Sequence, residues 1–453
     1  MKKGFVFIYM CLLLISLSAC TRLMTPEELI KPPELNVENK LIKDALNNAI
    51  PQGSVLYNLP YILHKKQEPG HKEQAFSLED FDGDGQQDVI ALYRNNSLQM
   101  TGLLVLKKNE DGWSKSNDLQ IDAAEVFDYE LKDIDGDGRF EVIFGYMDKA
   151  EAKLISIYRQ ENSSLINIFE ENYYSYVFST LEYPDRSFLV LSNFTPEPLS
   201  NTLKLFEYNE GGFNLVDQVF YSKGISPYNV QVGNIDRDNI GIFTDLYVNN
   251  AYGQSDILVF RNGKLKTIMP KMEASFTQRE PIPCADIDSD GIIEVVRTKD
   301  VNSEYFPGSG QPLFVKDYYK ILGLSSSEMI REIYEDSTDM YIKIIFPVEF
   351  WDKYFLTKDE SSQKLMIYYC PDNEKGYPYF PLMEIRYLSG SYKANYKDYY
   401  ILEETDSHIT VCKSIDSTEA VPLEYRDEFK KLLQLSYSPE KFIKVLEQER
   451  RSR

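Results

Sequence analysis

Three stretches of the sequence repeat an arrangement of acidic side chains that could hold a metal ion. Each has Asp at positions 1, 3 and 5, Gly at position 6, and Asp or Glu at position 9. Alternating Asp side chains can converge inside one tight turn, and Gly allows the sharp reversal. With the carbonyl oxygen of position 7 they form an oxygen cage of the kind that suits Ca²⁺, which takes about six to eight oxygen ligands. Named by their first residues, the loops and their expected ligands are loop 80 (Asp80, Asp82, Asp84, Gln86, Asp88), loop 133 (Asp133, Asp135, Asp137, Arg139, Glu141) and loop 286 (Asp286, Asp288, Asp290, Ile292, Glu294).

A fourth copy, loop 234, is incomplete. It keeps Asn234, Asp236 and Asp238 at positions 1, 3 and 5, but Ile242 stands where the other loops have an acid at position 9. Because one charged ligand is missing and another is replaced by an amide, we expect this loop to bind a metal weakly or not at all.

The complete loops have two alternative interpretations. An EF-hand needs helices on both sides and a bidentate acid at position 12. Loop 80 has Ala91 at that position and loop 133 has Phe144, and the Val-Ile and Val-Val pairs that follow the loops favour strands. The EF-hand interpretation therefore fails. Plain Asp-Gly turns without a metal remain the alternative.

The spacing of the loops predicts a repeated structural unit. The loops begin at residues 80, 133, 234 and 286, which gives a period of about 52 residues if a degenerate copy without the carboxylates lies near residue 183. A second feature has the same period, namely the turn pairs Asp111-Gly112, Asn162-Ser163, Gly211-Gly212 and Asn262-Gly263. A unit of this length with several short strands has the size of a propeller blade.

The repeats predict an all-β protein whose residues 54–416 form a β-propeller, with seven four-stranded blades and with six or eight as alternatives. Residues 336–346 and 370–377 fit a sixth unit, and residues 399–413 fit a hairpin of a seventh. An insertion at 302–312, which contains Gly and Pro, is expected to be a loop.

Further elements are predicted at both ends of the repeats. Residues 37–50 place apolar side chains at helical spacing. Residues 54–63 are expected to form a strand that closes the ring by pairing with the last blade. Two helices, at 423–435 and 439–448, are predicted within a C-terminal segment at 417–453.

The first twenty residues have the pattern of an export signal. Two Lys residues precede an apolar run at 4–17, which is shorter than the roughly 20 residues that span a bilayer. The run ends in Leu-Ser-Ala-Cys20, which resembles a lipobox. We expect a signal peptide at 1–19, lipidation of Cys20, and a tether with a short helix at 20–53. Acyl chains would then anchor the protein on the outer face of the bacterial cytoplasmic membrane. An uncleaved signal anchor with an incidental Cys is the alternative.

These motifs carry a family resemblance. The acidic nonapeptide followed by an apolar strand is similar to the FG-GAP (VCBS-type) repeat of integrin α-chain propellers and many bacterial surface proteins. The whole layout, a lipobox, then Lys31-Pro32-Pro33, a short helix and the repeats, resembles lipoproteins of unknown function from Gram-positive, clostridia-like bacteria. The resemblance implies a propeller and an anchor but no ligand. In integrin-like propellers the calcium loops lie on one face and are structural, and ligands bind elsewhere.

Three Cys residues remain outside the signal peptide and the predicted lipid site. Cys284, Cys370 and Cys412 are an odd number, so no disulfide framework is implied. We expect buried thiols, with a single Cys370–Cys412 bridge as the alternative.

Composition narrows the function classes. The net charge of −22 disfavours nucleic acid and anionic lipid as direct partners. The 33 Tyr residues favour strands, with an aromatic sugar-binding surface as the alternative. The chain has only three His residues and no recognised catalytic motif. We therefore expect a binding or scaffold module of the cell envelope, with an unknown protein or glycan ligand. The alternative is an enzyme, built on the propeller, that acts on envelope polysaccharide or peptide.

Overall fold

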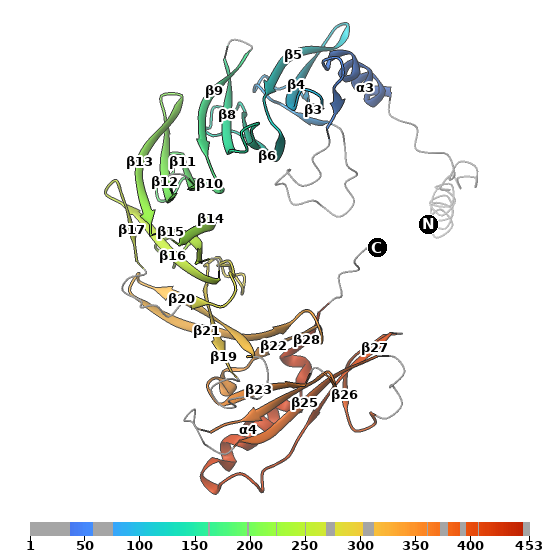
Figure 1. Cartoon of the computed structure of the whole chain (residues 1–453), viewed down its shortest axis with the longest axis vertical. Coiled ribbons are helices and arrows are strands. Elements are labelled where there is room, and N and C mark those ends of the chain that lie inside the picture. Colours follow the sequence, from blue (N-terminus) through green and yellow to red (C-terminus); the bar gives the residue numbers. More distant parts are fainter. Residues whose placement is uncertain are drawn as a thin grey trace, which may run out of the picture. The chain divides into compact units, whose positions relative to one another are not determined.

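The computed structural model confirms an all-β protein. In the described residues, strands form six antiparallel sheets (Figure 1). Two compact units divide the chain, and their boundary runs through the strands at residues 153–172. The signal peptide, Cys20, the turn at 162–163 and most of the 302–312 insertion lie outside the described residues, which are 37–57, 76–161, 164–196, 199–222, 224–249, 251–268, 277–301, 312–359, 361–371, 379–389, 396–405 and 407–446.

Helix α3 covers one side of the first sheet. Its buried Ile42 and Leu46 pack against apolar side chains of the sheet, which confirms the helix expected at 37–50. The strands are hydrogen-bonded in the order β1-β3-β4-β5, and β2 also pairs with β3. The elements are α3 (Val37–Ala49), β1 (Val55–Leu56), β2 (Ser77–Glu79), β3 (Asp88–Asn95), β4 (Met100–Asn109) and β5 (Gly112–Ile121).

Strand β1 corrects one expectation. We expected residues 54–63 to pair with the last blade, but Val55 and Leu56 pair with Arg94 and Tyr93 of the first sheet. Strand β2 covers only the beginning of β3. The remaining length of that edge therefore has free backbone groups, and β1 satisfies them. Residues 58–63 lie outside the described part of the chain.

The second, third and fourth sheets are antiparallel meanders whose spatial order follows the chain. Their hairpin turns include the predicted pairs at 211–212 and 262–263, and the pair at 111–112 joins β4 to β5. The strands are β6 (Glu125–Lys132), β7 (Glu141–Met147), β8 (Lys153–Glu161) and β9 (Ser164–Asn172); β10 (Ser175–Ser179), β11 (Phe188–Pro196), β12 (Leu199–Asn209) and β13 (Gly212–Tyr221); and β14 (Ile225–Asn234), β15 (Ile240–Val248), β16 (Tyr252–Arg261) and β17 (Lys264–Thr267), with β18 (Thr277–Gln278) pairing with β16.

The strands of the first two sheets differ in how deeply their side chains are buried. Strands β3 and β7 are buried along almost their whole length, whereas β5 and β9 are mostly half-buried or exposed. A strand covered on both faces becomes continuously apolar, which explains the Val-Ile runs that follow the acidic loops. In the second unit, Phe188 of β11 and Phe260 of β16 share one core between the third and fourth sheets.

The strands at the C-terminal end form two sheets, and the seven-blade count stays a prediction. Strands that the period assigned to a sixth and a seventh unit do not form separate sheets: residues 342–346 belong to the fifth sheet, and the hairpin at 400–414 pairs with β25 of the sixth. The fifth sheet contains β19 (Val295–Asp300), β20 (Phe314–Leu322), β21 (Ser326–Asp336), β22 (Ile342–Phe346) and β28 (Ile443–Val445); the sixth contains β23 (Tyr354–Asp359), β24 (Lys364–Tyr369), β25 (Phe380–Ser389), β26 (Tyr400–Glu404) and β27 (His408–Ser414).

The C-terminal segment contains one of the two expected helices. Helix α4 (Arg426–Ser436), preceded by the 3₁₀ turn η5 (Leu423–Tyr425), confirms the first. The helix expected at 439–448 is wrong, because only the 3₁₀ turn η6 (Pro439–Lys441) forms before β28 begins. Strand β28 pairs with the edge of β22 and buries Phe442 and Ile443 against the sheet. Sheet pairing satisfies an otherwise open edge, and this outweighs the helical spacing of the sequence. A further 3₁₀ turn, η3 (Val348–Phe350), links the fifth and sixth sheets.

Candidate metal centre

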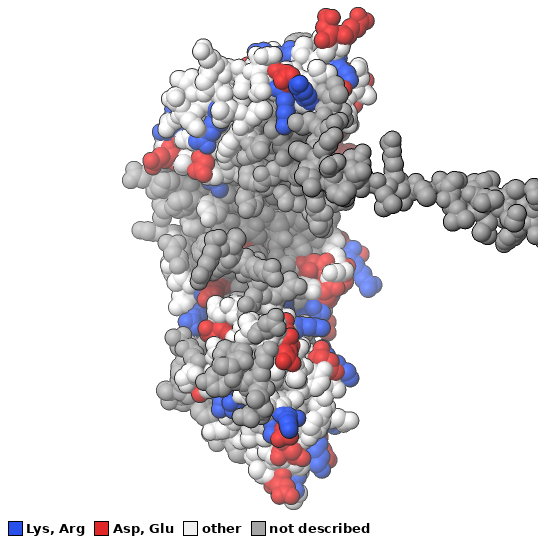
Figure 2. Space-filling view, turned by 90° about the vertical axis from the view of Figure 1, so that its right-hand side faces the viewer, with Lys and Arg blue, Asp and Glu red and all other residues white. Residues whose placement is uncertain are grey.

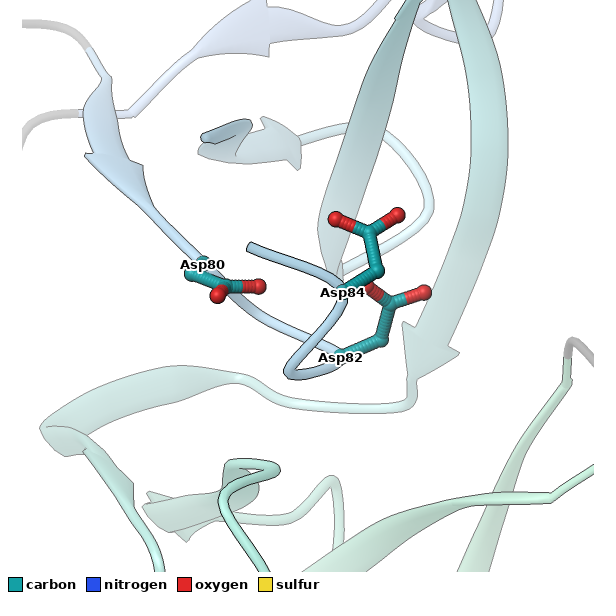
Figure 3. Close-up of side chains that lie close together, drawn as sticks. All are labelled: Asp80, Asp82 and Asp84. Atoms are coloured by element: carbon teal, nitrogen blue, oxygen red, sulfur yellow. The ribbon is translucent and has the colours of Figure 1, made fainter. Parts of the chain in front are cut away.

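The three complete loops adopt the same backbone turn, shown for loop 80 in Figure 3. Loop 80 leaves β2 and enters β3 at Asp88. Positions 4 and 6 have positive φ in every complete loop, at 72° and 83° in loop 80, 78° and 86° in loop 133, and 64° and 85° in loop 286. Position 6 is Gly in all three, because Gly adopts this left-handed conformation at little cost.

Backbone N–H groups fix the carboxylates of positions 1 and 5. The position-6 Gly donates its N–H to the position-1 Asp at 2.9 Å in loop 80, 3.0 Å in loop 133 and 2.9 Å in loop 286. The N–H of position 7 donates to the position-5 Asp at 2.8, 2.9 and 3.0 Å in the same order. Position 7 is Gln86, Arg139 or Ile292, and the metal-binding role of its carbonyl oxygen stays a prediction.

The position-9 acids Asp88, Glu141 and Glu294 are buried at the end of each loop, where two of them begin the next strand. Each accepts a hydrogen bond from the backbone N–H of position 2, at 3.3 Å in loop 80 and 2.9 Å in the other two. Burial is the main cause that raises the pKa of Asp88 to about 6 and that of Glu141 to about 7, and it also raises the pKa of Glu294. Each acid therefore holds the backbone of its loop through this hydrogen bond, and its burial disfavours the ionised form of the carboxyl group.

Three acids of each loop converge closely enough to share a cation. One carboxylate oxygen from each lies within 4.8 Å of the other two, in the groups Asp80, Asp82 and Asp84; Asp133, Asp135 and Glu141; and Asp286, Asp288 and Asp290. Oxygens on opposite sides of Ca²⁺, each about 2.4 Å from the ion, would be about 4.8 Å apart. The spacing and the purely oxygen donor set therefore fit this ion.

Buried oxygens without hydrogen-bond partners also fit a cation. In loop 80 these are Oδ1 of Asp80 and Oδ1 of Asp82, and in loop 286 the atom is Oε1 of the fully buried Glu294. An ionised oxygen that is removed from water and left unpaired is costly. A metal ion bound in the loop would remove that cost.

Some predicted ligands lie outside these groups. Asp88 and Glu294 are the position-9 acids that bind backbone N–H groups. Asp137 accepts a hydrogen bond from Nε of Arg139 at 2.8 Å, within the same loop. The structure thus brings together nine of the predicted carboxylates, three in each complete loop.

Lysine side chains enter two of the loops. Lys107 of β4 forms ion pairs with Asp82 and Asp84, and Lys320 of β20 forms ion pairs with Asp288 and Asp290. Partial burial alone would lower the pKa of each lysine, but the hydrogen bonds to the two carboxylates outweigh it and raise both pKa values. The sequence pattern does not reveal these two lysines, because their contacts depend on strand pairing.

In loop 234, protein donors satisfy the carboxylate at position 3. The carboxylate of Asp236 accepts hydrogen bonds from the N–H of Asp238 at 2.9 Å, the side chain of Asn239 at 2.7 Å and the N–H of Gly323 at 3.1 Å. Ile242 is fully buried in the core between the third and fourth sheets. The expectation that this loop binds weakly or not at all stays a prediction.

The loops also link consecutive sheets. In the first unit, the N–H of Phe140 in loop 133 donates to the carbonyl of Phe81 in loop 80 at 3.0 Å. In the second unit, the N–H of Ile293 in loop 286 donates to the carbonyl of Asn234 at 2.9 Å. A metal that stiffens one loop would therefore also restrain its neighbour.

A second group of charged residues lies in the fifth sheet, away from the loops. Asp317 pairs with Arg297 at 2.6 Å, and Glu332 lies opposite Asp317 on the next strand. Both acids are fully buried, and neither oxygen of Glu332 has a hydrogen-bond partner. Burial is the main cause that raises the pKa of Glu332 to about 7. In the sequence, a lone Asp317 inside an apolar strand is the signal that could have indicated this cluster.

One His residue and three Cys residues of the described chain are buried, namely His408, Cys284, Cys370 and Cys412. His408 begins β27, and its Nε2 is 2.8 Å from Oε2 of Glu403. Cys284, Cys370 and Cys412 are buried thiols that form no disulfide with one another, so the expected buried thiols are confirmed and the alternative bridge is wrong. His64 and His71 lie outside the described residues.

Figure 2 shows one face of the molecule, on which described acidic and basic side chains lie close to one another in mixed groups.

No helix among the described residues is long and apolar enough to cross a membrane.

Comparisons with known proteins add little to the geometry. No protein-family model matches the sequence, and no curated protein matches it. Among solved structures, the chain is similar to a crystal structure described as a candidate 6-phosphogluconolactonase from Bacteroides uniformis ATCC 8492. The identity is 13% and the TM-score is 0.32, with 64% of this chain and 79% of the other covered. A likeness at this level carries no argument about function.

Proposed function

We propose that this protein is a lipid-anchored, extracytoplasmic β-propeller that binds calcium and serves as a binding or scaffold module of the cell envelope. The observation that carries the proposal is the repeated acidic loop. Three copies combine the same turn, the same backbone hydrogen bonds and three carboxylate oxygens within 4.8 Å of one another. A purely oxygen cage with several negative charges is the kind of site that Ca²⁺ occupies in proteins.

Calcium would stiffen the scaffold. Without a cation, the clustered carboxylates of each loop repel one another, so metal binding and local folding should be coupled. Hydrogen bonds join loop 80 to loop 133 and loop 234 to loop 286. Ordering one loop would therefore restrain the sheet that follows. The ligand of the module is then expected to bind at a surface other than the metal loops.

The propeller itself is part of the proposal. The meander order of successive sheets and the apolar cores between sheets of the second unit support it. The six sheets of the described residues agree with the six-blade alternative, and the seven-blade count rests on the sequence period. Small-angle X-ray scattering of the mature chain tests closure. A scattering profile of an extended open array would contradict a closed ring.

The lipid anchor rests on the sequence around Cys20. Expression of Cys20→Ala in a Gram-positive host should release the protein from the membrane fraction or leave its signal peptide uncut. The wild-type protein serves as the control, and intact-cell protease digestion reports the side of the membrane. A variant that remains processed and membrane-bound would contradict the lipidation of Cys20.

The calcium assignment is tested by metal analysis and melting. The purified mature chain should contain Ca²⁺ and should lose thermal stability after treatment with EDTA. Calcium at about a hundredfold excess over Kd would stabilise the folded state by about 2.7 kcal/mol per site. Magnesium at the same concentration is the control, because it demands a stricter octahedral geometry. An unchanged melt together with no bound calcium would overturn the assignment.

The enzyme alternative would need acids that a substrate can reach. Asp317 and Glu332 converge away from the acidic loops, but both side chains are fully buried. Asp317 is also engaged by Arg297 at 2.6 Å. We therefore assign this pair to the interior of the fifth sheet and retain the binding or scaffold role.

A further inference from the structure

Two of the complete acidic loops have a lysine at the same structural position. Val89 pairs with Leu106 and Val295 pairs with Tyr319 across antiparallel strands. Lys107 and Lys320 are each the next residue along, so they lie across from the position-9 acid of their own loop. The same placement in two sheets far apart in the chain points to a shared role.

Each lysine holds its ammonium group among the carboxylates that would bind the metal. Nζ of Lys107 is 2.9 Å from Oδ2 of Asp84 and also bonds Asp82. Nζ of Lys320 is 2.9 Å from Oδ2 of Asp288, also bonds Asp290, and is 3.7 Å from Oε1 of Glu294. These acids include two of the three members of each converging group. At both loops, a lysine ammonium group of the protein itself therefore already supplies a positive charge to the carboxylates.

An ammonium and a divalent ion cannot share these oxygens. At separations of about 4 Å two positive charges repel strongly when they are partly shielded from water. The lysine side chains remain 30% and 17% exposed, which leaves each a path back to solvent. Partly exposed ion pairs of this kind are weak, so a divalent ion can displace the ammonium.

In loop 133, Arg139 belongs to the loop itself and bonds Asp137 through Nε at 2.8 Å. Asp137 is not a member of the converging group Asp133, Asp135 and Glu141. A competition between lysine and metal therefore concerns loops 80 and 286.

We propose that Lys107 and Lys320 are tethered competitors of the metal, which occupy loops 80 and 286 in the calcium-free protein and withdraw when Ca²⁺ binds. This inference rests on the proposed calcium binding. The lysines neutralise the loops when calcium is scarce and lower the affinity of these two sites. Calcium then fills loops 80 and 286 only above a concentration that the lysines set.

Calorimetric titration of the full mature chain with Ca²⁺ tests the competition. Lys107→Met and Lys320→Met keep the length of the side chain and remove the ammonium. Each should tighten one site by roughly tenfold, since the lost ion pairs no longer oppose the metal. The matched controls are Lys108→Met and Lys316→Met on the same two strands, whose amines pair with Glu38 and Glu335 instead. The controls should leave every site unchanged.

Amine labelling of the wild-type protein gives a second readout that needs no variant. Calcium should increase the reactivity of Lys107 and Lys320 toward an acylating reagent, measured by peptide mass spectrometry, while Lys108 and Lys316 stay constant. Calcium binding with unchanged affinities in both lysine variants and unchanged labelling would overturn the competition and leave calcium binding intact. No calcium binding by any variant would overturn both. Binding that appears only in the lysine variants would support the competition strongly.

Discussion

Loop 286 and loop 234 are neighbouring loops that differ in backbone conformation and in the partners of their acidic side chains. Loop 286 has positive φ at Ser289 and Gly291, whereas neither Arg237 nor Asn239 at the matching positions of loop 234 has positive φ. Oε1 of Glu294 in loop 286 is buried without a hydrogen-bond donor, while Asp236 in loop 234 accepts hydrogen bonds from three protein donors. The comparison indicates which loops a metal would stabilise. The relevant feature is a buried acid without a hydrogen-bond donor, rather than the number of Asp residues.

The sharpest way to break this comparison is to give loop 286 the position-9 residue of loop 234. Glu294→Ile should remove one calcium site and reduce calcium-dependent stabilisation by about 3 kcal/mol at a hundredfold excess of calcium over Kd. Urea unfolding with calcium and with EDTA measures the difference. Ile242→Val in loop 234 is the control and should lower stability equally in both conditions. A calcium stoichiometry unchanged by Glu294→Ile would contradict the role of the buried acid.

Glu332 tests whether burial without donors is costly where no loop is present. Its folded pKa of about 7 exceeds the ordinary value of 4.5, so its protonated form is favoured by folding. The contribution is present below pH 4.5 and is lost as the pH rises through 7, an effect of about 3 kcal/mol. Glu332→Gln should remove that decline in unfolding free energy between pH 5 and pH 8. The same slope in wild type and variant would show that Glu332 does not titrate there.

A smaller effect separates the two kinds of loop. Asp236→Asn replaces an acceptor of three hydrogen bonds and should destabilise the protein by about 1 to 2 kcal/mol. The shift in Tm should be the same with calcium and with EDTA. Asp288→Asn in loop 286 is the counterpart, and its effect should be larger with calcium. Equal calcium dependence for both variants would remove the distinction between the loops.

The smallest expected effect concerns the backbone of loop 286. Ser289 has a φ of 64° at the position where loops 80 and 133 have Gly. Ser289→Gly should therefore stabilise the protein by about 1 kcal/mol, because a side chain in the left-handed region is strained. Gly83→Ser is the reverse change and should destabilise, since its Cβ would approach the carbonyl oxygen of Gly138 to 2.8 Å. Thermal melts of both variants should move in opposite directions.

Local features of the fold could be predicted from the sequence. Helix α3 follows from apolar residues at helical spacing. The acidic turns and the hairpins at 111–112, 211–212 and 262–263 follow from Gly, Asn and Asp at fixed places. Each of these features involves residues close in the chain. The pairing of the hairpin at 400–414 and the strand at 443–445 could not be predicted. Both depend on which distant edge lies open, and periodicity does not encode that choice.

The candidate site was predictable in the same uneven way. The carboxylates of loops 80, 133 and 286 are recognisable from spacing alone. Lys107 and Lys320 are not, because their contacts arise from cross-strand register. The buried pair of Asp317 and Glu332 also depends on register, since the two residues are adjacent only across β20 and β21.

Strand β28 has a consequence for how the chain folds. Most strands of the first four sheets pair with strands that follow closely in the chain, so most of each sheet can form soon after its segment becomes available. The fifth sheet needs Ile443–Val445, which lies about 100 residues beyond its partner β22, and such distant closure is slow. Until it occurs, the edge of β22 is open to pairing with another chain. The interval before β28 docks is therefore the stage at which newly made chains are most exposed to aggregation.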